Sequence, residues 1–236
     1  MRKVRIEMIY DPSCPWCYIG KRQLDHAVAS RPQLCVEISR WPFILNPDVP
    51  RTGVDRRNYL CRKYGSEARL RRMHEAIHDV GRAIGLNFAF DAIHWTPNTM
   101  LAHRFLLLAE KHGRGDPAME AVFAAYFQQG RDIGDPLVLN SIGRDLGLDP
   151  HSVRNFLNSQ ADRERVIAAN QRAQRLGING VPTFVFDGKL IICGAQEPYP
   201  LARMLDAAAQ ITAVFDLLPG QPMPLRVSPP PEGSFI

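Results

Sequence analysis

One stretch near the N-terminus decides the fold, and it reads Val4-Arg5-Ile6-Glu7-Met8-Ile9-Tyr10-Asp11-Pro12-Ser13-Cys14-Pro15-Trp16-Cys17. Apolar side chains recur at every second position up to Tyr10, which predicts a β-strand with one strongly apolar face. Asp11-Pro12 ends that pattern, and helical spacing then runs from the cysteines to about Ser30. The stretch therefore predicts a strand that passes into a helix, with two cysteines at the junction.

The two ends of the chain together predict an α/β fold. A second strand with alternating apolar residues follows at 34–38, so the chain opens as a βαβ unit with a right-handed crossover. Near the other end, apolar runs at 183–186 and 189–192 flank Asp187-Gly188, which predicts a β-hairpin. A helix is expected after Pro198, and it completes a ββα unit.

Between these ends, helix signals with almost no strand signals run from about Val54 to Leu176. We therefore predict a thioredoxin fold with a large all-helical insertion between its βαβ and ββα halves. The predicted division is a discontinuous thioredoxin-like domain at 1–50 and 165–215, the insertion at 51–164, and a loose proline-rich tail at 216–236.

The composition excludes several classes of protein. Of 236 residues, 45% are apolar, which argues against a disordered chain. No apolar run approaches the ~18 residues that a membrane helix needs. Arg5 and Glu7 interrupt the apolar stretch behind Met1-Arg2-Lys3, which makes it a poor signal peptide, so we expect a cytoplasmic protein that does not bind a membrane. No Cys/His finger or RNP-type aromatic motif is present, so nucleic acid is not an expected partner, and a homodimer stays open.

The chain has five cysteines, and only Cys14 and Cys17 are close in sequence. An odd number in a chain of this length does not indicate a structural disulfide framework. We expect Cys35, Cys61 and Cys193 to be buried or half-buried free thiols, and a second redox pair involving Cys61 is the alternative.

The placement of Cys14-Pro15-Trp16-Cys17 at a strand-to-helix junction favours redox chemistry. Cys14 falls at the helix N-cap and Pro15 at the first helical position. We expect the free N–H groups of the first turn, including that of Cys17, to face the Cys14 sulfur. Together with the helix dipole they would lower the pKa of Cys14 below the usual value of about 8.5. Cys14 would then form a mixed disulfide that Cys17 resolves, in a groove lined by Trp16.

Other interpretations of the cysteine pair fit less well. Half of a zinc site would need a second closely spaced pair of ligands, which the chain lacks, so no metal is expected. His74 and His78 lie four residues apart without an evident acidic third ligand, and we interpret them as a helix face. Two inert core cysteines would leave the proline beside an N-cap cysteine unexplained.

A second feature is Gly180-Val181-Pro182-Thr183, at the start of the predicted hairpin. In the thioredoxin topology, the loop before this strand lies against the Cys-x-x-Cys helix. A cis proline there would present the backbone of Val181 to an incoming chain, which could add as a short strand. We therefore expect Val181 and Pro182 to bind substrate together with Pro15 and Trp16.

Several stretches carry a family resemblance, and in chain order they are 13–21 (SCPWCYIGK), 42–47 (PFILNP), 97–99 (PNT) with 102–104 (AHR), 130–135 (GRDIGD), and 180–184 (GVPTF) with 194–196 (GAQ). On these residues the chain resembles the DsbA-like thioredoxin-fold superfamily, and specifically its cytoplasmic FrnE-like branch. The resemblance implies a thioredoxin fold with a helical insertion and dithiol–disulfide exchange through Cys14 and Cys17. It also implies that Pro182 is cis.

The same superfamily contains glutathione-dependent 2-hydroxychromene-2-carboxylate isomerases and kappa-class glutathione transferases, which resemble this chain in the insertion. They typically carry a serine at the position of Cys14, whereas this chain keeps both cysteines. The resemblance therefore implies a thiol–disulfide oxidoreductase, and a glutathione-dependent isomerase or transferase is the alternative. No cofactor is required for the exchange, glutathione is the candidate co-substrate, and the expected partner is a disulfide-containing protein or a small thiol.

The segment 51–82 holds nine Lys or Arg and four Asp or Glu, and its excess of +5 equals that of the whole chain. We interpret it as a solvated helical face. The alternative is a basic surface that binds an acidic partner, which would make the protein a binding module without catalysis.

Overall fold

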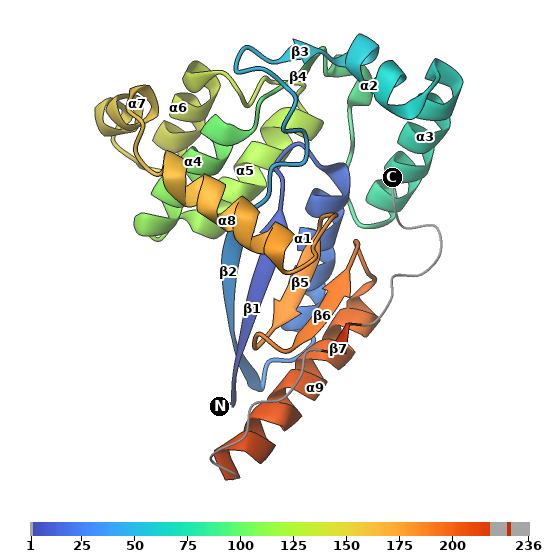
Figure 1. Cartoon of the computed structure of the whole chain (residues 1–236), viewed down its shortest axis with the longest axis vertical. Coiled ribbons are helices and arrows are strands. Elements are labelled where there is room, and N and C mark those ends of the chain that lie inside the picture. The colour runs from blue at the N-terminus through green and yellow to red at the C-terminus, as the bar shows by residue number, and fades with distance from the viewer. Residues whose placement is uncertain (1, 218–225, 228–236) are drawn as a thin grey trace.

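The structure is a computed structural model that describes residues 2–217 and 226–227. A five-stranded sheet forms its base, and most of the inserted helices gather beyond one end of that sheet (Figure 1). The strands of the sheet are β1 (Arg2–Tyr10), β2 (Leu34–Pro42), β5 (Thr183–Phe186), β6 (Leu190–Cys193) and β7 (Arg226–Val227). The helices are α1 (Pro15–Ala29), α2 (Arg56–Tyr64), α3 (Glu67–Ala83), α4 (Met100–Lys111), α5 (Gly115–Phe127), α6 (Pro136–Asp145), α7 (Pro150–Asn158), α8 (Arg163–Arg175) and α9 (Pro198–Leu217).

The strand order β2-β1-β5-β6-β7 confirms the predicted thioredoxin topology. β1 pairs parallel with β2 and antiparallel with β5, and β5 pairs antiparallel with β6. β1 therefore lies inside the sheet, and its C-terminal end passes directly into α1. The predicted hairpin is confirmed, although its second strand begins one residue later, at Leu190. Asp187 and Gly188 adopt positive φ angles in the turn, and the Lys189 N–H closes it by donating to the Phe186 carbonyl.

The two faces of the sheet bury different sets of helices. Val4, Ile6 and Met8 point into a core that also contains residues of α1 and α9. Ile9 and its neighbour Val185 point to the opposite face, where residues of α8 pack against them. This period-two alternation is the one that the sequence predicts for β1, except that both of its faces are covered.

The insertion is helical as expected, with a small exception and a short 3₁₀ turn, η1 (Phe90–Ala92). Two residue pairs, β3 (Val54–Asp55) and β4 (Trp95–Thr96), form an antiparallel ladder. The expectation of an all-helical insertion is wrong at this point, because two extended residues carry no periodicity that a sequence pattern could reveal. In the part of the chain that the structure describes, no helix has the length and apolarity to cross a membrane.

The predicted proline-rich tail falls mostly outside the described residues. Within 216–236, the structure describes the end of α9 and β7, which pairs parallel with β6 at Leu190 and Ile191. The division of the chain into domains stays a prediction.

Aromatic stacking joins the insertion to α1. Tyr18 of α1 stacks on Phe123 of α5 with ring centroids 4.9 Å apart, and Phe127 lies 6.3 Å from the same ring. The buried Lys21, one turn further along α1, pairs with Asp25 and with Asp116 of α5. The βαβ half and the insertion thus share one core rather than meeting at a polar boundary.

We expect Phe127→Ala to lower the free energy of unfolding by about 3–5 kcal/mol, because it empties a fully buried site in this shared core. Leu137→Ala is the matched control, since Leu137 is 72% exposed and its loss should cost less than about 0.5 kcal/mol. Urea denaturation of both variants measures the difference. Equal losses would show that the aromatic cluster does not hold the insertion in place.

Candidate active site

The two cysteines of the motif lie at the start of α1, directly after β1. Cys14 is the N-cap residue with an extended backbone, and Pro15 occupies the first turn. The Cys14 N–H donates to the carbonyl of Asp11 at 3.1 Å, which fixes the tight turn between strand and helix. Both sulfurs are enclosed, since Cys14 is 3% exposed and Cys17 is fully buried.

The Cys14 thiol faces the loop before β5. Its Sγ donates to the carbonyl oxygen of Val181 at 3.5 Å. The expectation that the Cys17 N–H would face this sulfur is wrong, because that N–H donates to the Cys14 carbonyl at 3.0 Å and no backbone group caps through the Cys14 side chain. Backbone hydrogen bonds close the first turn, and the Cys14 sulfur contacts the Val181 carbonyl instead.

Cys17 is the more enclosed of the two thiols. Burial raises its thiol pKa far above the ordinary value, and the hydrogen bond and charge of Cys14 raise it further. The two thiols therefore differ in environment. Cys14 opens onto a cavity, whereas Cys17 is packed into the core.

The loop around Pro182 is held against α1. The Val181–Pro182 peptide bond is cis, and the Gly194 N–H donates to the Pro182 carbonyl at 2.8 Å. A Cβ at Gly20 of α1 would lie 2.8 Å from Pro182 Cγ and 3.2 Å from the Phe184 ring. Only glycine at position 20 lets the helix approach this loop so closely.

A buried carboxylate, Asp11, organises the turn behind the cysteines. It is fully buried and accepts hydrogen bonds from the Ser13 N–H and hydroxyl, both at 2.7 Å. It also accepts from the Leu45 N–H and the Thr99 hydroxyl, both at 2.9 Å. His103 Nε2 lies 3.8 Å away and contacts the Phe43 carbonyl at 3.0 Å. One carboxylate thus joins the end of β1, the segment after β2 and the start of α4.

These hydrogen bonds set the charge state of Asp11. Burial alone would raise its pKa, but the nearby His103, with the donors from Leu45 and Ser13, outweighs burial and lowers the pKa. Our sequence interpretation used Asp11 only as the end of a strand and missed this role. The signal was present in the stretches 42–47, 97–99 and 102–104, which supply its partners.

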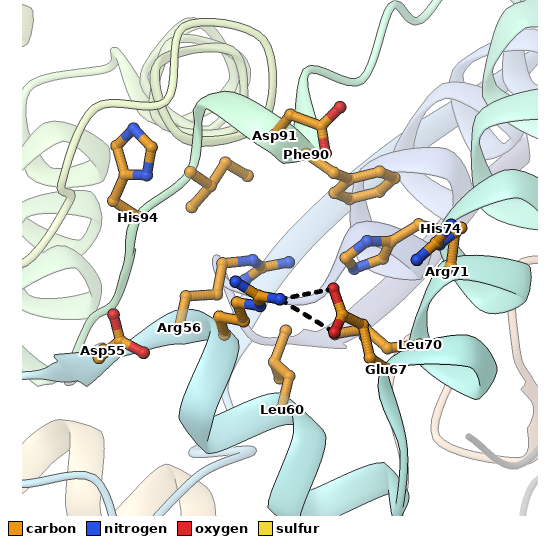
Figure 2. A pocket seen from close by; sticks show the side chains of 12 residues that line it. Asp55, Arg56, Leu60, Glu67, Leu70, Arg71, His74, Phe90, Asp91 and His94 are labelled. Atoms are coloured by element: carbon orange, nitrogen blue, oxygen red, sulfur yellow. Dashed lines mark hydrogen bonds and ion pairs between the residues drawn. The ribbon is translucent and has the colours of Figure 1, made fainter.

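A cavity of about 50 Å³ opens beside Cys14. Pro15 and the half-buried Trp16 line it, together with residues of α2 and α3. A larger cavity of about 360 Å³ adjoins it and shares Arg56, Leu60 and His74 with it (Figure 2). The insertion therefore supplies one wall of the space in front of the cysteine.

The chain is similar to several known proteins in sequence and in structure. A family model described as DSBA-like thioredoxin domain matches residues 5–206. The chain belongs to this family. A probable DsbA oxidoreductase from Streptomyces coelicolor shares its structure with a TM-score of 0.82 and 28% identity, covering 94% of each chain.

Two further relatives show the range of the fold. An uncharacterized protein of Bacillus subtilis (strain 168), YwbO, is 28% identical over 193 residues, which cover 81% of this chain and 90% of YwbO. A 2-hydroxychromene-2-carboxylate isomerase has a TM-score of 0.65 at 14% identity, covering 89% of this chain and 98% of its own. The DSBA-like fold therefore occurs in both of the functional classes that the sequence suggests.

The other three cysteines lie on three different elements, β2, α2 and β6, and a second redox pair involving Cys61 stays a prediction. All five cysteines are free thiols. Cys61 and Cys193 are half-buried, as expected, whereas Cys35 is exposed because it lies on the outward side of β2. Among residues 2–217 and 226–227, no three His, Cys, Asp or Glu side chains gather as metal ligands would. His74 stacks on Phe90 with ring centroids 4.2 Å apart.

The basic segment is mostly the solvated face that we expected, with one departure. Eight of its nine cations are exposed, and these are Arg51, Arg57, Arg62, Lys63, Arg69, Arg71, Arg72 and Arg82. Arg56, in contrast, is only 8% exposed and lines both cavities. A count of charges along the sequence could not separate this residue from its neighbours.

We expect Asp11→Asn to lower the free energy of unfolding at neutral pH by about 2–4 kcal/mol, because an amide cannot replace a carboxylate that accepts four hydrogen bonds. The Asp11 pKa is lower in the folded chain than the unfolded value of about 4. The ionised carboxylate therefore stabilises the fold above about pH 4, and this contribution is lost as the pH falls through the folded pKa.

Urea denaturation at neutral pH and at successively lower pH measures this difference. The gap between wild type and Asp11→Asn should narrow on acidification, whereas the control Asp145→Asn, at an exposed position, should stay within about 0.5 kcal/mol of wild type. A gap that does not change with pH would contradict the assigned charge of Asp11.

Proposed function

We propose that this chain is a thiol–disulfide oxidoreductase that exchanges disulfides through Cys14 and Cys17. The observation that carries the proposal is the pairing of two thiols of unequal environment at a helix N-terminus, with the outer sulfur against the Val181 carbonyl. Membership of the DSBA-like family supports it. A structural role for the pair would not need one thiol to open onto a cavity.

In the proposed reaction, the Cys14 thiolate attacks one sulfur of a substrate disulfide and forms a mixed disulfide, while the other substrate sulfur leaves as a thiolate and takes up a proton. Cys17 then loses its proton and attacks the Cys14 sulfur. The second substrate thiol is released, so the substrate gains two electrons and two protons and the protein holds a Cys14–Cys17 disulfide. The reverse sequence oxidises a dithiol.

The remaining predicted site residues would position the substrate. Val181 and Pro182 border the Cys14 sulfur on one side, so a substrate segment that adds beside this loop brings its disulfide to Cys14. Pro15 and Trp16 line the other side of the opening. The exchange needs no bound cofactor, and glutathione is the candidate small-thiol co-substrate.

The experiment that tests the function is insulin disulfide reduction by wild type and by single cysteine variants. We expect Cys14→Ser to lose more than about 100-fold in rate, because the attacking thiolate is gone. Cys17→Ser should accumulate a mixed disulfide, detectable by mass spectrometry. Cys35→Ser, which removes an exposed thiol on β2, is the control and should behave as wild type.

The isomerase alternative predicts an activity that does not depend on Cys17. It requires saturable glutathione binding and turnover of a small aromatic substrate that survives Cys17→Ser. If Cys14→Ser reduced insulin as fast as the wild-type protein does, disulfide exchange through this pair would be ruled out.

The second step should depend steeply on pH. Burial, which remains in the mixed disulfide, raises the pKa of Cys17 far above neutrality, so only a small fraction is thiolate. The rate of resolution should therefore rise about tenfold per pH unit between pH 6 and 9. Stopped-flow mixing of reduced protein with a disulfide, quenched with acid, measures the lifetime of the mixed disulfide. A lifetime that is flat over this range would contradict the high pKa.

A further inference from the structure

The buried cation Arg56 is not explained by disulfide exchange. It is the first residue of α2, and its backbone N–H donates to the His94 carbonyl at 3.0 Å. Its side chain is enclosed between the cavity beside Cys14 and the larger cavity of the insertion. A guanidinium stays charged at any physiological pH, so its burial is unfavourable unless an anion compensates the charge.

No anion compensates Arg56 within the described residues. Its Nη1 donates to the Tyr126 hydroxyl at 2.9 Å and the guanidinium lies 5.8 Å from the centre of that ring, but Tyr126 is neutral because burial raises its pKa. Its Nε is buried without a hydrogen-bond partner. The neighbouring Arg57, in contrast, is exposed and is satisfied by both oxygens of Glu67. Arg56 therefore has unused donor capacity at a buried position.

The lining of the cavity beside Cys14 is positively charged. Its charged lining consists of Arg56 and Lys63, and no Asp or Glu is among the described residues that line it. Lys63 donates to the amide oxygen of Asn46, which is uncharged. His74, which also lines it, is neutral at physiological pH because burial, and then the charge of Arg56, lower its pKa to about 4. An anion entering this cavity would meet two cations and no repelling carboxylate.

The larger cavity gives such an anion a place. In Figure 2, Arg56 and His74 extend into this space from α2 and α3. Asp55, Glu67 and Asp91 also line this space, but among the described residues no ion pair joins any of them to Arg56. Asp55 accepts from the Asn58 N–H at the start of α2, and Glu67 accepts from Arg57 with both oxygens. Asp91, at the edge of the cavity, lies beyond Phe90 and away from Arg56. A planar guanidinium with free N–H groups suits a carboxylate, which accepts two parallel hydrogen bonds from it. The small cavity then leads from Arg56 to the Cys14 sulfur.

We propose that Arg56 binds a carboxylate of the disulfide substrate, so that the protein reacts preferentially with disulfides that carry an acidic group close to the sulfur. The inference rests on the proposed function and names the substrate class of the same site. Cys14 attacks the nearer sulfur while Arg56 holds the carboxylate, the distal thiolate leaves, and Cys17 releases the bound half as a second thiol. The charge of Arg56 takes no part in the electron transfer and acts by positioning.

The test compares two aromatic disulfides, anionic dithiobis(nitrobenzoate) and uncharged dithiodipyridine, at neutral pH. Reduced protein with Cys35, Cys61 and Cys193 replaced by serine confines the reaction to the Cys14–Cys17 pair. The readout is the ratio of the two second-order rate constants, anionic over neutral. We expect Arg56→Met to lower this ratio about tenfold or more, and Arg56→Lys to lower it less, because an ammonium keeps the charge without the two parallel donors.

Matched variants separate binding from folding. Arg72→Met removes an exposed cation of α3 that lines neither cavity and should leave the ratio unchanged. Tyr126→Phe removes the hydrogen bond to Arg56 but keeps the cation, so the anionic preference should persist. Raising the salt concentration should lower the ratio more for wild type than for Arg56→Met, which keeps Lys63 in the cavity.

Two outcomes overturn the proposal: an Arg56→Met ratio equal to that of wild type, or an equal loss with Arg72→Met. The first includes the case in which both rates fall together, which would mean that Arg56 supports the cysteine or the fold. The neutral disulfide reports separately on the proposed function, because a wild-type protein whose Cys14 reacts with neither probe would refute disulfide exchange itself.

Discussion

The turn that carries Cys14 depends on one buried carboxylate. Asp11 is fully enclosed, and its hydrogen-bond donors come from the turn itself, from the segment after β2 and from the start of α4. A buried ion is tolerated only when its lone pairs are satisfied, so these three segments must meet at one point. The N-terminus of α1, and with it Cys14, is placed by that requirement. Aromatic stacking around Tyr18 then joins the same helix to α5.

Asp11 and α1 each contact part of the insertion. The insertion is therefore part of the candidate site and not a separate addition to the fold. Cys14 and Val181 come from the thioredoxin-like halves, whereas Arg56 and Lys63, across the cavity, come from α2. The sheet and α1 determine where the two thiols lie. The inserted helices determine the charge and the volume of the space in front of Cys14.

Local patterns predicted the parts of the fold that local forces determine. The alternation in β1, the Asp-Gly turn before β6 and the cysteine at the N-cap of α1 are each visible within a few residues of sequence. The Asp11 network is not, because its partners Leu45 and Thr99 lie 34 and 88 residues away. The predicted direction of the Cys17 N–H was also wrong, since its hydrogen bond to the Cys14 carbonyl competes with one to the Cys14 sulfur.

Arg56 shows why a charged segment cannot be interpreted from composition alone. Nine cations crowd residues 51–82, and a solvated face is correct for eight of them. The ninth differs because the β3–β4 ladder and the bond from Arg56 to the His94 carbonyl turn the start of α2 inward, towards Tyr126 and Cys14. Two extended residue pairs, too short for any periodicity to reveal, thus decide which cation is buried. The proposed preference for acidic disulfides therefore rests on the least predictable element of the fold.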